Sequence, residues 1–412
     1  MNAKPDNAYK HRMGERKLTL VGADGALLKN REVSVEQKKH SFLFGCAGFD
    51  SIPLANNEYN VNEKEKSEER FRKFFELFNY VTLPFYWGRF EPVKGKPDTE
   101  RLKNTAQWLV SKGVKLKGHP LCWHTVTAPW LLDMSNAEIL AAQLNRIHRD
   151  VSDFTGLIDI WDVINEVVIM PIFDKYDNGI TRICKELGRI RTVREMFSAT
   201  KKANPGATLL INDFETSESY DILVEGLLEA GIPIDAIGIQ SHMHQGYWGV
   251  EKTQEVLERF SRFKLPLHFT ENTLLSGHIM PSEIVDLNDY QIEEWPSTPE
   301  GEERQAAEAV LHFRTLFRHP GIESITWWDF KDGGWLNAPA GLIRRDDSAK
   351  PAYDELLKLV RNEWWTKPLH TVTDETGSIT VSGFLGEYEV TCGGTKRQFD
   401  LVKNGVSEVI TL

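Results

Sequence analysis

Apolar residues recur along the chain with two different periods. Short β-like runs occur at residues 42–45, 80–87, 114–124, 157–166, 207–214, 236–243, 265–271 and 322–330. Stretches with apolar residues at helical spacing occur at residues 65–78, 100–112, 138–154, 188–203, 220–230, 250–263, 302–317 and 353–360. Eight strands that alternate with eight helices predict an α/β fold, a (β/α)8 or TIM barrel, over residues 41–362.

The two ends of the chain carry a different pattern. Residues 17–21 and 31–35 alternate as strands around a turn signal at Ala23-Asp24-Gly25, and we predict that they form a hairpin. The tail from residue 366 is rich in Thr, Val and Gly, with runs typical of about four short strands. Neither segment alone makes a sufficient core. We therefore predict that residues 15–40 and 366–412 pair into one small all-β sandwich.

Two glutamates stand at the ends of predicted barrel strands. Glu166 closes the fourth strand and Glu271 closes the seventh. The catalytic groups of such barrels lie at the C-terminal ends of the strands, so both carboxyl groups are expected at one mouth. A carboxyl pair suits glycosidic bond cleavage, in which one group donates a proton and the other attacks or activates water.

Composition narrows the range of ligands. The formal net charge of −11 argues against a nucleic-acid or anionic-membrane partner, and no apolar run reaches the roughly 18 residues of a membrane span. Residues 1–16 are polar without a signal-peptide pattern, so either a cytoplasmic location or secretion with a removed leader is expected. The 12 Trp residues suit sugar faces, although about half are expected in the core, including Trp161, Trp327 and Trp364.

Cysteine and histidine spacing gives little support for a metal or a cofactor. The four cysteines lack a C-x-x-C pair and are expected as buried free thiols. His242 and His244 share one strand face and would suit a metal, but no completing carboxylate is evident. We predict no cofactor and no metal, with His124 and His244 in structural roles.

Several motifs, in order, resemble glycoside hydrolase family 10, the retaining endo-β-1,4-xylanases. The resemblance covers about residues 40–362. It rests on Gly118-His119-Pro120-Leu121-Cys122-Trp123-His124, Trp161-Asp162-Val163-Ile164-Asn165-Glu166, Asn212-Asp213-Phe214, Gln240-Ser241-His242, His268-Phe269-Thr270-Glu271, Trp328 and Trp335. It implies a monomeric enzyme that cleaves xylan or xylo-oligosaccharides with retention of configuration.

The resemblance also implies a role for each matched residue. Glu166 would be the acid/base and Glu271 the nucleophile. Asn165 would bond the sugar 2-hydroxyl, which requires a bulge or twist because neighbouring strand residues point to opposite faces. His242 would keep Glu271 ionised, and Gln240 would face the same way. The reacting sugar would lie against His119, Trp123, Trp328 and Trp335.

The second strand departs from the family pattern. Relatives carry Glu-Asn-x-x-Lys there, whereas this chain has Phe85-Tyr86-Trp87. We predict that stacking replaces polar contacts, with Phe85 and Trp87 on one strand face as candidates for sugar binding and Tyr86 on the other face. A Phe at position 214, where Tyr is common, removes one hydroxyl.

Two alternative functions remain open at this level. Another retaining β-glycosidase, either a β-xylosidase or an arabinosidase, would use the same two glutamates. A non-catalytic carbohydrate-binding barrel is expected to have lost a glutamate or Asn165, and all three residues are present.

Overall fold

A computed structural model describes residues 7–412, so the first six residues of the polar N-terminal segment lie outside it. Eight parallel strands close into a barrel in the order β10-β3-β4-β5-β6-β7-β8-β9. The strands are β3 (Leu43–Ala47), β4 (Tyr80–Pro84), β5 (Lys115–His119), β6 (Ile160–Asn165), β7 (Thr208–Asp213), β8 (Ala236–Met243), β9 (Leu267–Leu274) and β10 (Ile322–Trp327). The predicted barrel is therefore confirmed.

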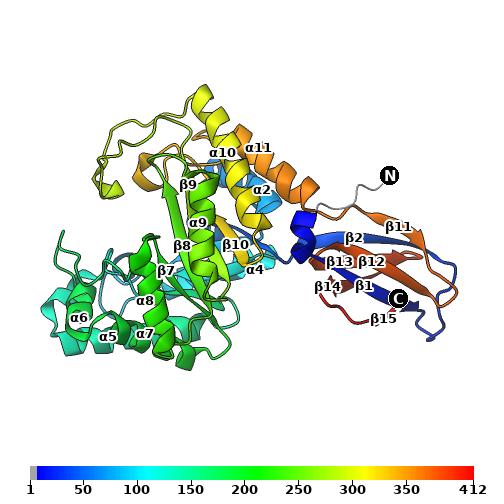
Figure 1. Ribbon diagram of the computed structural model, residues 1–412, viewed down its shortest axis with the longest axis horizontal. Coiled ribbons are helices and arrows are strands. Elements are labelled where there is room, and N and C mark those ends of the chain that lie inside the picture. The colour runs from blue at the N-terminus through cyan, green and yellow to red at the C-terminus, as the bar shows by residue number, and fades with distance from the viewer. Residues whose placement is uncertain (1–6) are drawn as a thin grey trace.

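Helices cover the outside of the barrel (Figure 1). The eight predicted ones are α2 (Val61–Leu77), α4 (Thr99–Ser111), α5 (Asn136–Phe154), α7 (Arg189–Ala203), α8 (Glu218–Glu229), α9 (Gly249–Ser261), α10 (Pro299–Arg318) and α11 (Pro351–Lys358). Three shorter helices were not predicted: α1 (Ser51–Ala55), α3 (Trp87–Phe90) and α6 (Gly179–Leu187). Capping boxes at Asn60 and Ser135 fix where α2 and α5 begin.

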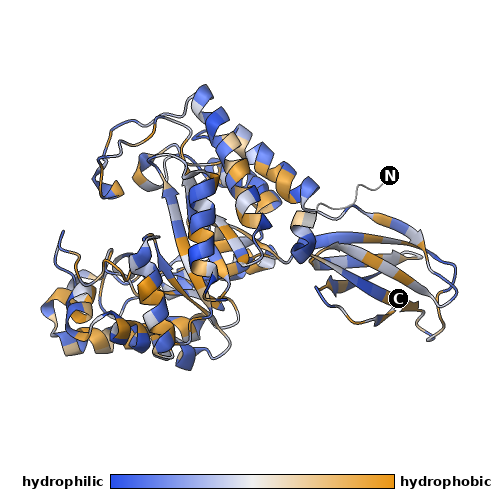
Figure 2. Ribbon diagram, in the orientation of Figure 1, coloured by the Kyte–Doolittle hydropathy of each residue, from blue (hydrophilic) through white to orange (hydrophobic). Residues whose placement is uncertain are grey.

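The buried positions follow the strand and helix periodicities of the sequence. Every residue of β9 is buried, because one face meets the barrel interior and the other meets the helices. Helix α9 buries Val256, Leu257 and Phe260 and keeps its charged residues outside. Figure 2 shows this as a hydrophilic outer face on α9.

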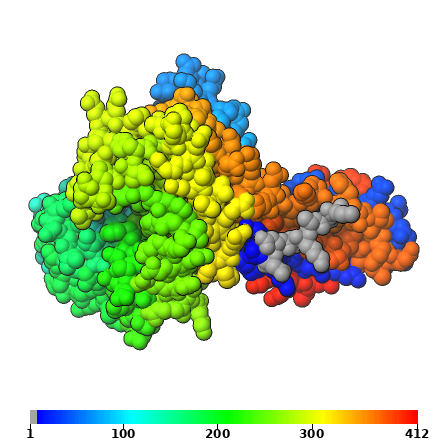
Figure 3. All heavy atoms as spheres, turned by 45° about the horizontal axis from the view of Figure 1, so that its top comes forward, coloured from blue at the N-terminus to red at the C-terminus, as the bar shows by residue number. Residues whose placement is uncertain are grey.

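Both chain ends build a separate two-sheet module. One sheet has the order β12-β1-β15 and the other β11-β2-β13-β14. The strands are β1 (Met13–Val21), β2 (Glu32–His40), β11 (Leu369–Val372), β12 (Ser378–Phe384), β13 (Gly386–Cys392), β14 (Thr395–Leu401) and β15 (Glu408–Thr411). We call these two sheets the sandwich. Figure 3 shows it as a smaller lobe beside the barrel.

The predicted hairpin of residues 17–21 and 31–35 is wrong. The first segment lies in β1 and the second in β2, and these two strands belong to opposite sheets. Leu18 and Leu20 of β1 face Val33 and Val35 of β2 across the shared apolar core. The turn signal is real, but the chain crosses from one sheet to the other instead of folding back in the same sheet. The exact boundaries of the sandwich remain predictions.

The sandwich adjoins the N-terminal end of the barrel, opposite the mouth. Strand β2 ends at His40, just before β3 begins, and the ring of His40 packs against Phe44 and Phe317. Arg12 donates hydrogen bonds to the carbonyl oxygens of Phe317 and His319. The C-terminal ends of the barrel strands are thus left clear of the sandwich. No helix within residues 7–412 is both long and apolar enough to cross a membrane.

Candidate active site at the barrel mouth

An irregular end of β6 turns Asn165 and Glu166 towards the same place. The pairing of β6 with β7 shifts register between Asp162 and Ile164, so β6 carries one extra residue. Glu166 itself has φ of 57°, a left-handed conformation that costs a non-glycine residue on the order of 1 kcal/mol. As a result, Asn165 Nδ2 donates to Oε1 of Glu166 at 3.2 Å although the two residues are neighbours.

A second bulge lies in β9 beside Glu271. Both neighbouring strands shift register here, and Thr270 is the residue that pairs with neither. Thr270 Oγ1 donates to Asn212 Oδ1 at 2.6 Å, and Asn212 Nδ2 donates to Glu271 Oε1 at 2.7 Å. In a regular strand these two consecutive side chains would point to opposite faces.

Two amides join the glutamates into one network. Asn212 Nδ2 also donates to Asn165 Oδ1 at 2.8 Å. Gln240 Nε2 donates to Asn165 Oδ1 at 3.1 Å and to Glu166 Oε1 at 3.3 Å. The neighbouring Gly238 is required, because a Cβ there would lie 2.4 Å from Asn212 Oδ1. The side chains at the ends of β6, β7, β8 and β9 therefore converge on both carboxyl groups.

Basic side chains surround Glu271. His242 Nε2 donates to Glu271 Oε2 at 2.9 Å, and Thr273 Oγ1 lies 2.9 Å from His242 Nδ1. Burial alone would raise the pKa of Glu271, but His119, the hydrogen bond from His242 and the charge of Lys117 outweigh it. The pKa of Glu271 therefore lies below its ordinary value, and the carboxylate is ionised.

Glu166 has the opposite shift. Burial of its carboxyl group raises the pKa to about 8. The 2.7 Å hydrogen bond from Trp123 Nε1 opposes this rise, and the negative charges of Asp213 and Glu271 add to it. Glu166 is thus protonated at neutral pH while Glu271 is ionised. These are the protonation states that a general acid and a nucleophile require.

A buried ion pair supports the network from below. Lys117 Nζ and His119 Nδ1 each lie 2.7 Å from Asp162 Oδ2. All three side chains are almost fully buried. Asp162 and Asn165 both face the barrel interior although they are three residues apart, because the extra residue in β6 lies between them.

Aromatic rings wall the mouth. The rings of Tyr86 and Trp328 lie 5.7 Å and 5.4 Å from His119. Tyr86 also packs against Trp123 at 5.6 Å. Trp335 lies 4.6 Å from the ring of His242. These rings provide flat apolar surfaces beside the two carboxyl groups, which suits the C–H faces of sugars.

The prediction that Phe85 and Trp87 line the cleft is wrong. Phe85 is fully buried and packs against Phe154 and Trp161, in the layer between barrel and helices. Trp87 packs against Trp130 and donates its indole N–H to a glutamate of the same helical turn. Tyr86 faces the mouth instead. All three residues follow β4, which ends at Pro84, and Trp87 begins α3, so the strand alternation behind the prediction does not extend to them.

Several site residues were absent from the predicted set. Lys117, Asp162, Asn212 and Thr270 all take part in the network. Asp162 and Asn212 are polar residues in largely apolar strands, and this was the available signal for them. Strands β5 and β9 contain several polar residues, so no such signal marked Lys117 and Thr270.

The remaining histidines and tryptophans of the motifs play no direct part in the network. His124 packs on Phe173 and His244 on Trp335, and burial lowers their pKa values to about 4 and about 3. Trp161, Trp327 and Trp364 are fully buried, as predicted. Within residues 7–412, no group of three or more His, Cys, Asp or Glu side chains is arranged to hold a metal.

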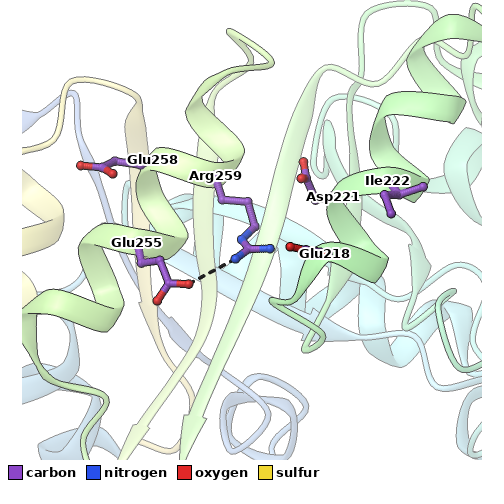
Figure 4. A pocket seen from close by; sticks show the side chains of 6 residues that line it. All are labelled: Glu218, Asp221, Ile222, Glu255, Glu258 and Arg259. Carbon is purple, nitrogen blue, oxygen red and sulfur yellow. Dashed lines mark hydrogen bonds and ion pairs between the residues drawn. The ribbon is translucent and has the colours of Figure 1, made fainter.

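A hollow of about 450 Å³ lies elsewhere, between α8 and α9. Figure 4 shows its charged lining, with Arg259 paired to Glu255. The hollow is on the outer helix layer, away from the strand ends, and its lining includes none of the residues of the carboxylate network.

Known proteins resemble this chain in sequence. It is 23% identical to an endo-1,4-beta-xylanase/feruloyl esterase of Xylanibacter ruminicola, over 73% of this chain and 44% of that one. It is 23% identical to the anti-sigma-I factor RsgI6 of Acetivibrio thermocellus, over 91% of this chain and 44% of the relative. The chain thus spans less than half the length of these relatives.

Solved structures share the fold. GH10 from Paenibacillus barcinonensis has a TM-score of 0.64 at 22% identity, over 78% of this chain and 95% of that one. Xylanase 10B from Thermotoga petrophila in complex with xylobiose has a TM-score of 0.62, with the same identity and coverage. The family model of glycosyl hydrolase family 10 matches residues 47–359. The chain belongs to glycosyl hydrolase family 10.

Proposed function

We propose that this chain is a monomeric endo-1,4-β-xylanase that hydrolyses internal β-1,4-xylosidic bonds with retention of configuration. One observation carries the proposal. Two glutamates in a single hydrogen-bond network have pKa values shifted in opposite directions, to about 8 for Glu166 and below the ordinary value for Glu271. Family membership and the xylanases among the relatives support xylan as the substrate.

In the first step Glu271 attacks the anomeric carbon and Glu166 gives its proton to the leaving oxygen. The hydrogen bond from His242 keeps the attacking carboxylate ionised and oriented. A covalent glycosyl ester results, in which Glu271 no longer carries a charge.

The second step uses the same residues with exchanged charges. The negative charge of Glu271 is one of the causes that raise the pKa of Glu166. Ester formation removes that charge, so the pKa of Glu166 falls and its carboxylate can accept a proton from water. Water then cleaves the ester, and the proton returns to Glu166.

The sugar is proposed to lie between His119 and the rings of Trp328, Trp335 and Tyr86. Tyr86 takes the place that the family gives to polar groups, so binding on that side relies on stacking. Trp123 has a second task, because its indole N–H orients Glu166.

Product analysis tests the proposal. The chain is incubated with plain xylan, glucuronoxylan and arabinoxylan, and the products are separated by chromatography. Internal cleavage gives a ladder of oligosaccharides and a rapid loss of viscosity, whereas a β-xylosidase releases only xylose and an arabinosidase only arabinose. NMR of the fresh products must show the β-anomer first. Initial appearance of the α-anomer would rule out the double displacement.

A further inference from the structure

A short turn in the loop between β9 and α10 spans one half of the mouth. Its 3-10 helix is η3 (Leu287–Asp289), and residues 286–289 are called the strap here. On one side Trp335 Nε1 donates to Asn288 Oδ1 at 3.1 Å. On the other side Lys175 Nζ lies 2.6 Å from both Asp286 Oδ2 and Asp289 Oδ1. The strap thus ties the loop after β10 to the loop before α6.

Each anchor of the strap is connected to one of the glutamates through packed side chains. The ring of Trp335 lies 4.6 Å from His242, which bonds Glu271. Beside Lys175, Tyr176 packs against Phe173 at 4.9 Å. Figure 1 shows the loop after β9 reaching towards the part of the molecule that carries α6.

The chain of rings continues from Phe173 to the acid. Phe173 packs on His124 at 4.5 Å, and His124 adjoins Trp123, whose N–H bonds Glu166. The strap therefore lies over the half of the mouth between β6 and β9, within a few contacts of both carboxyl groups.

The proposed mechanism assigns a task to this half. Glu166 protonates the leaving oxygen, so the leaving part of the substrate lies beside it. The opposite half is bounded by the rings of Phe49, Tyr86 and Trp328, against which the reacting sugar is proposed to lie. On that mechanism a short leaving group would end under the strap, whereas a polymer would continue past it.

We propose that Lys175 is a specificity-determining residue that holds the strap closed over the leaving-group side and so disfavours polymeric xylan relative to short substrates. This inference rests on the proposed function. The strap has to separate from Lys175 before a long xylan chain can occupy both halves of the mouth. Its ion pairs suit reversible opening, because the side chains of Lys175, Asp286 and Asp289 are 38%, 31% and 63% exposed. Such pairs contribute little and are screened by salt.

Two variants of Lys175 test the strap. Lys175→Met keeps the aliphatic stem and removes the charge, and Lys175→Arg keeps the charge. For each, kcat/KM is measured on soluble polymeric xylan and on an aryl β-xylobioside, whose leaving group is short. We expect Lys175→Met to raise the ratio of polymer to aryl substrate by roughly threefold to tenfold, and Lys175→Arg to keep it.

The same ion pairs can be removed by changing the two aspartates of the strap. Asp286→Asn removes a charge but keeps an oxygen that can accept from the backbone N–H of Asn288, which Asp286 Oδ1 now does at 2.9 Å. The turn is therefore preserved, and the double variant Asp286→Asn/Asp289→Asn should match Lys175→Met. Sodium chloride should raise the ratio for the unchanged chain and leave it constant for Lys175→Met.

Lys201→Met is the matched control. Lys201 of α7 lies 3.7 Å from Asp235, and its side chain is 37% exposed, but Asp235 directly precedes β8, so the pair is at the N-terminal end of the barrel strands, far from the mouth. Its ratio should equal that of the unchanged chain. A ratio that stays constant or falls in Lys175→Met overturns the inference, and a fall would mean that the strap binds the leaving sugars. If the unchanged chain cleaves neither substrate, the proposed function fails and the strap inference fails with it.

Discussion

The two ends of the barrel bury different kinds of side chain. The end beside the sandwich is closed mainly by rings, with Phe317 stacked on Trp364 at a centroid distance of 4.1 Å and Phe44 on the same indole at 5.8 Å. The mouth buries Lys117, Asp162 and other polar groups around its glutamates. Burying charge is costly unless every partner is present, whereas ring packing is favourable in itself. Stability and chemistry are therefore concentrated at opposite ends of one fold.

The comparison predicts that changes at the mouth affect turnover far more than folding. Glu271→Gln removes the nucleophile and should lower kcat on any substrate by roughly 10⁴-fold or more. The melting temperature, followed by circular dichroism, should change little by comparison, because the amide keeps the size of the side chain and one oxygen that can accept from either Asn212 or His242. Residual turnover within tenfold of the unchanged chain would exclude Glu271 as the nucleophile.

Glu166→Ala should separate two kinds of substrate. Polymer hydrolysis should fall by roughly 10²- to 10⁴-fold, whereas an aryl glycoside with a good leaving group should still form the ester. External azide should then speed ester breakdown and give a β-azide product. If azide instead rescues Glu271→Ala to a β-azide product, the two roles are reversed.

The pH profile of the unchanged chain follows from the same two residues. Glu166 must be protonated in the first step, so kcat/KM should decline as the pH rises through about 8. Glu271 must be ionised, so the acid limb should lie below the ordinary glutamate pKa. On the aryl substrate, the alkaline limb should be absent in Glu166→Ala. An alkaline limb that persists in this variant would assign that ionisation to another group.

At the sandwich end of the molecule, changes should affect folding more than turnover. Deleting residues 366–412 removes five strands and uncovers the apolar side chains of Leu18, Leu20, Val33 and Val35. The protein should lose solubility or melt earlier, while any folded fraction keeps its kcat. Thermal melts and active-site titration measure the two effects separately. A truncated chain with unchanged melting temperature and solubility would show that the sandwich adds nothing to the barrel.

The smallest effect on activity is expected at Tyr86, which adjoins the packing residue Phe85. Tyr86→Ala should raise KM on short xylo-oligosaccharides by up to roughly tenfold, the value of about one stacking contact. Phe85→Ala is the matched control, because this fully buried ring packs against Trp161, and its loss should cost about 3–5 kcal/mol of stability. If Tyr86→Ala leaves oligosaccharide kinetics unchanged, the ring packs against His119 and Trp123 without binding the sugar.

Periodicity was sufficient for the barrel and for the position of its glutamates. The face of a strand was harder to predict, because both faces of a barrel strand are buried. Phe85 and Tyr86 are both aromatic, and composition alone does not say which of them meets the helices. Both residues follow the end of β4 at Pro84, and only the tertiary packing places Phe85 against Phe154 and Tyr86 against His119.

Long-range partners explain the other differences. The amide of Asn212 acquires its importance from Thr270 and Glu271, two strands away in the barrel. Lys117 looks like a surface residue in sequence until Asp162 on the next strand pairs with it. The supposed hairpin failed for the same reason, since the partners of β1 and β2 lie at the far end of the chain.

The sandwich also has a consequence for the order of folding. The hydrogen bond from the backbone N–H of Arg31 to Thr373 joins residues 342 positions apart. On a ribosome that adds roughly 5–20 residues per second, β2 would wait about 20–70 seconds for its partners. The barrel can be complete before the sandwich begins to close. The first strands to be synthesised are thus among the last to be paired, and meanwhile their apolar faces are open to chaperones or to a second chain.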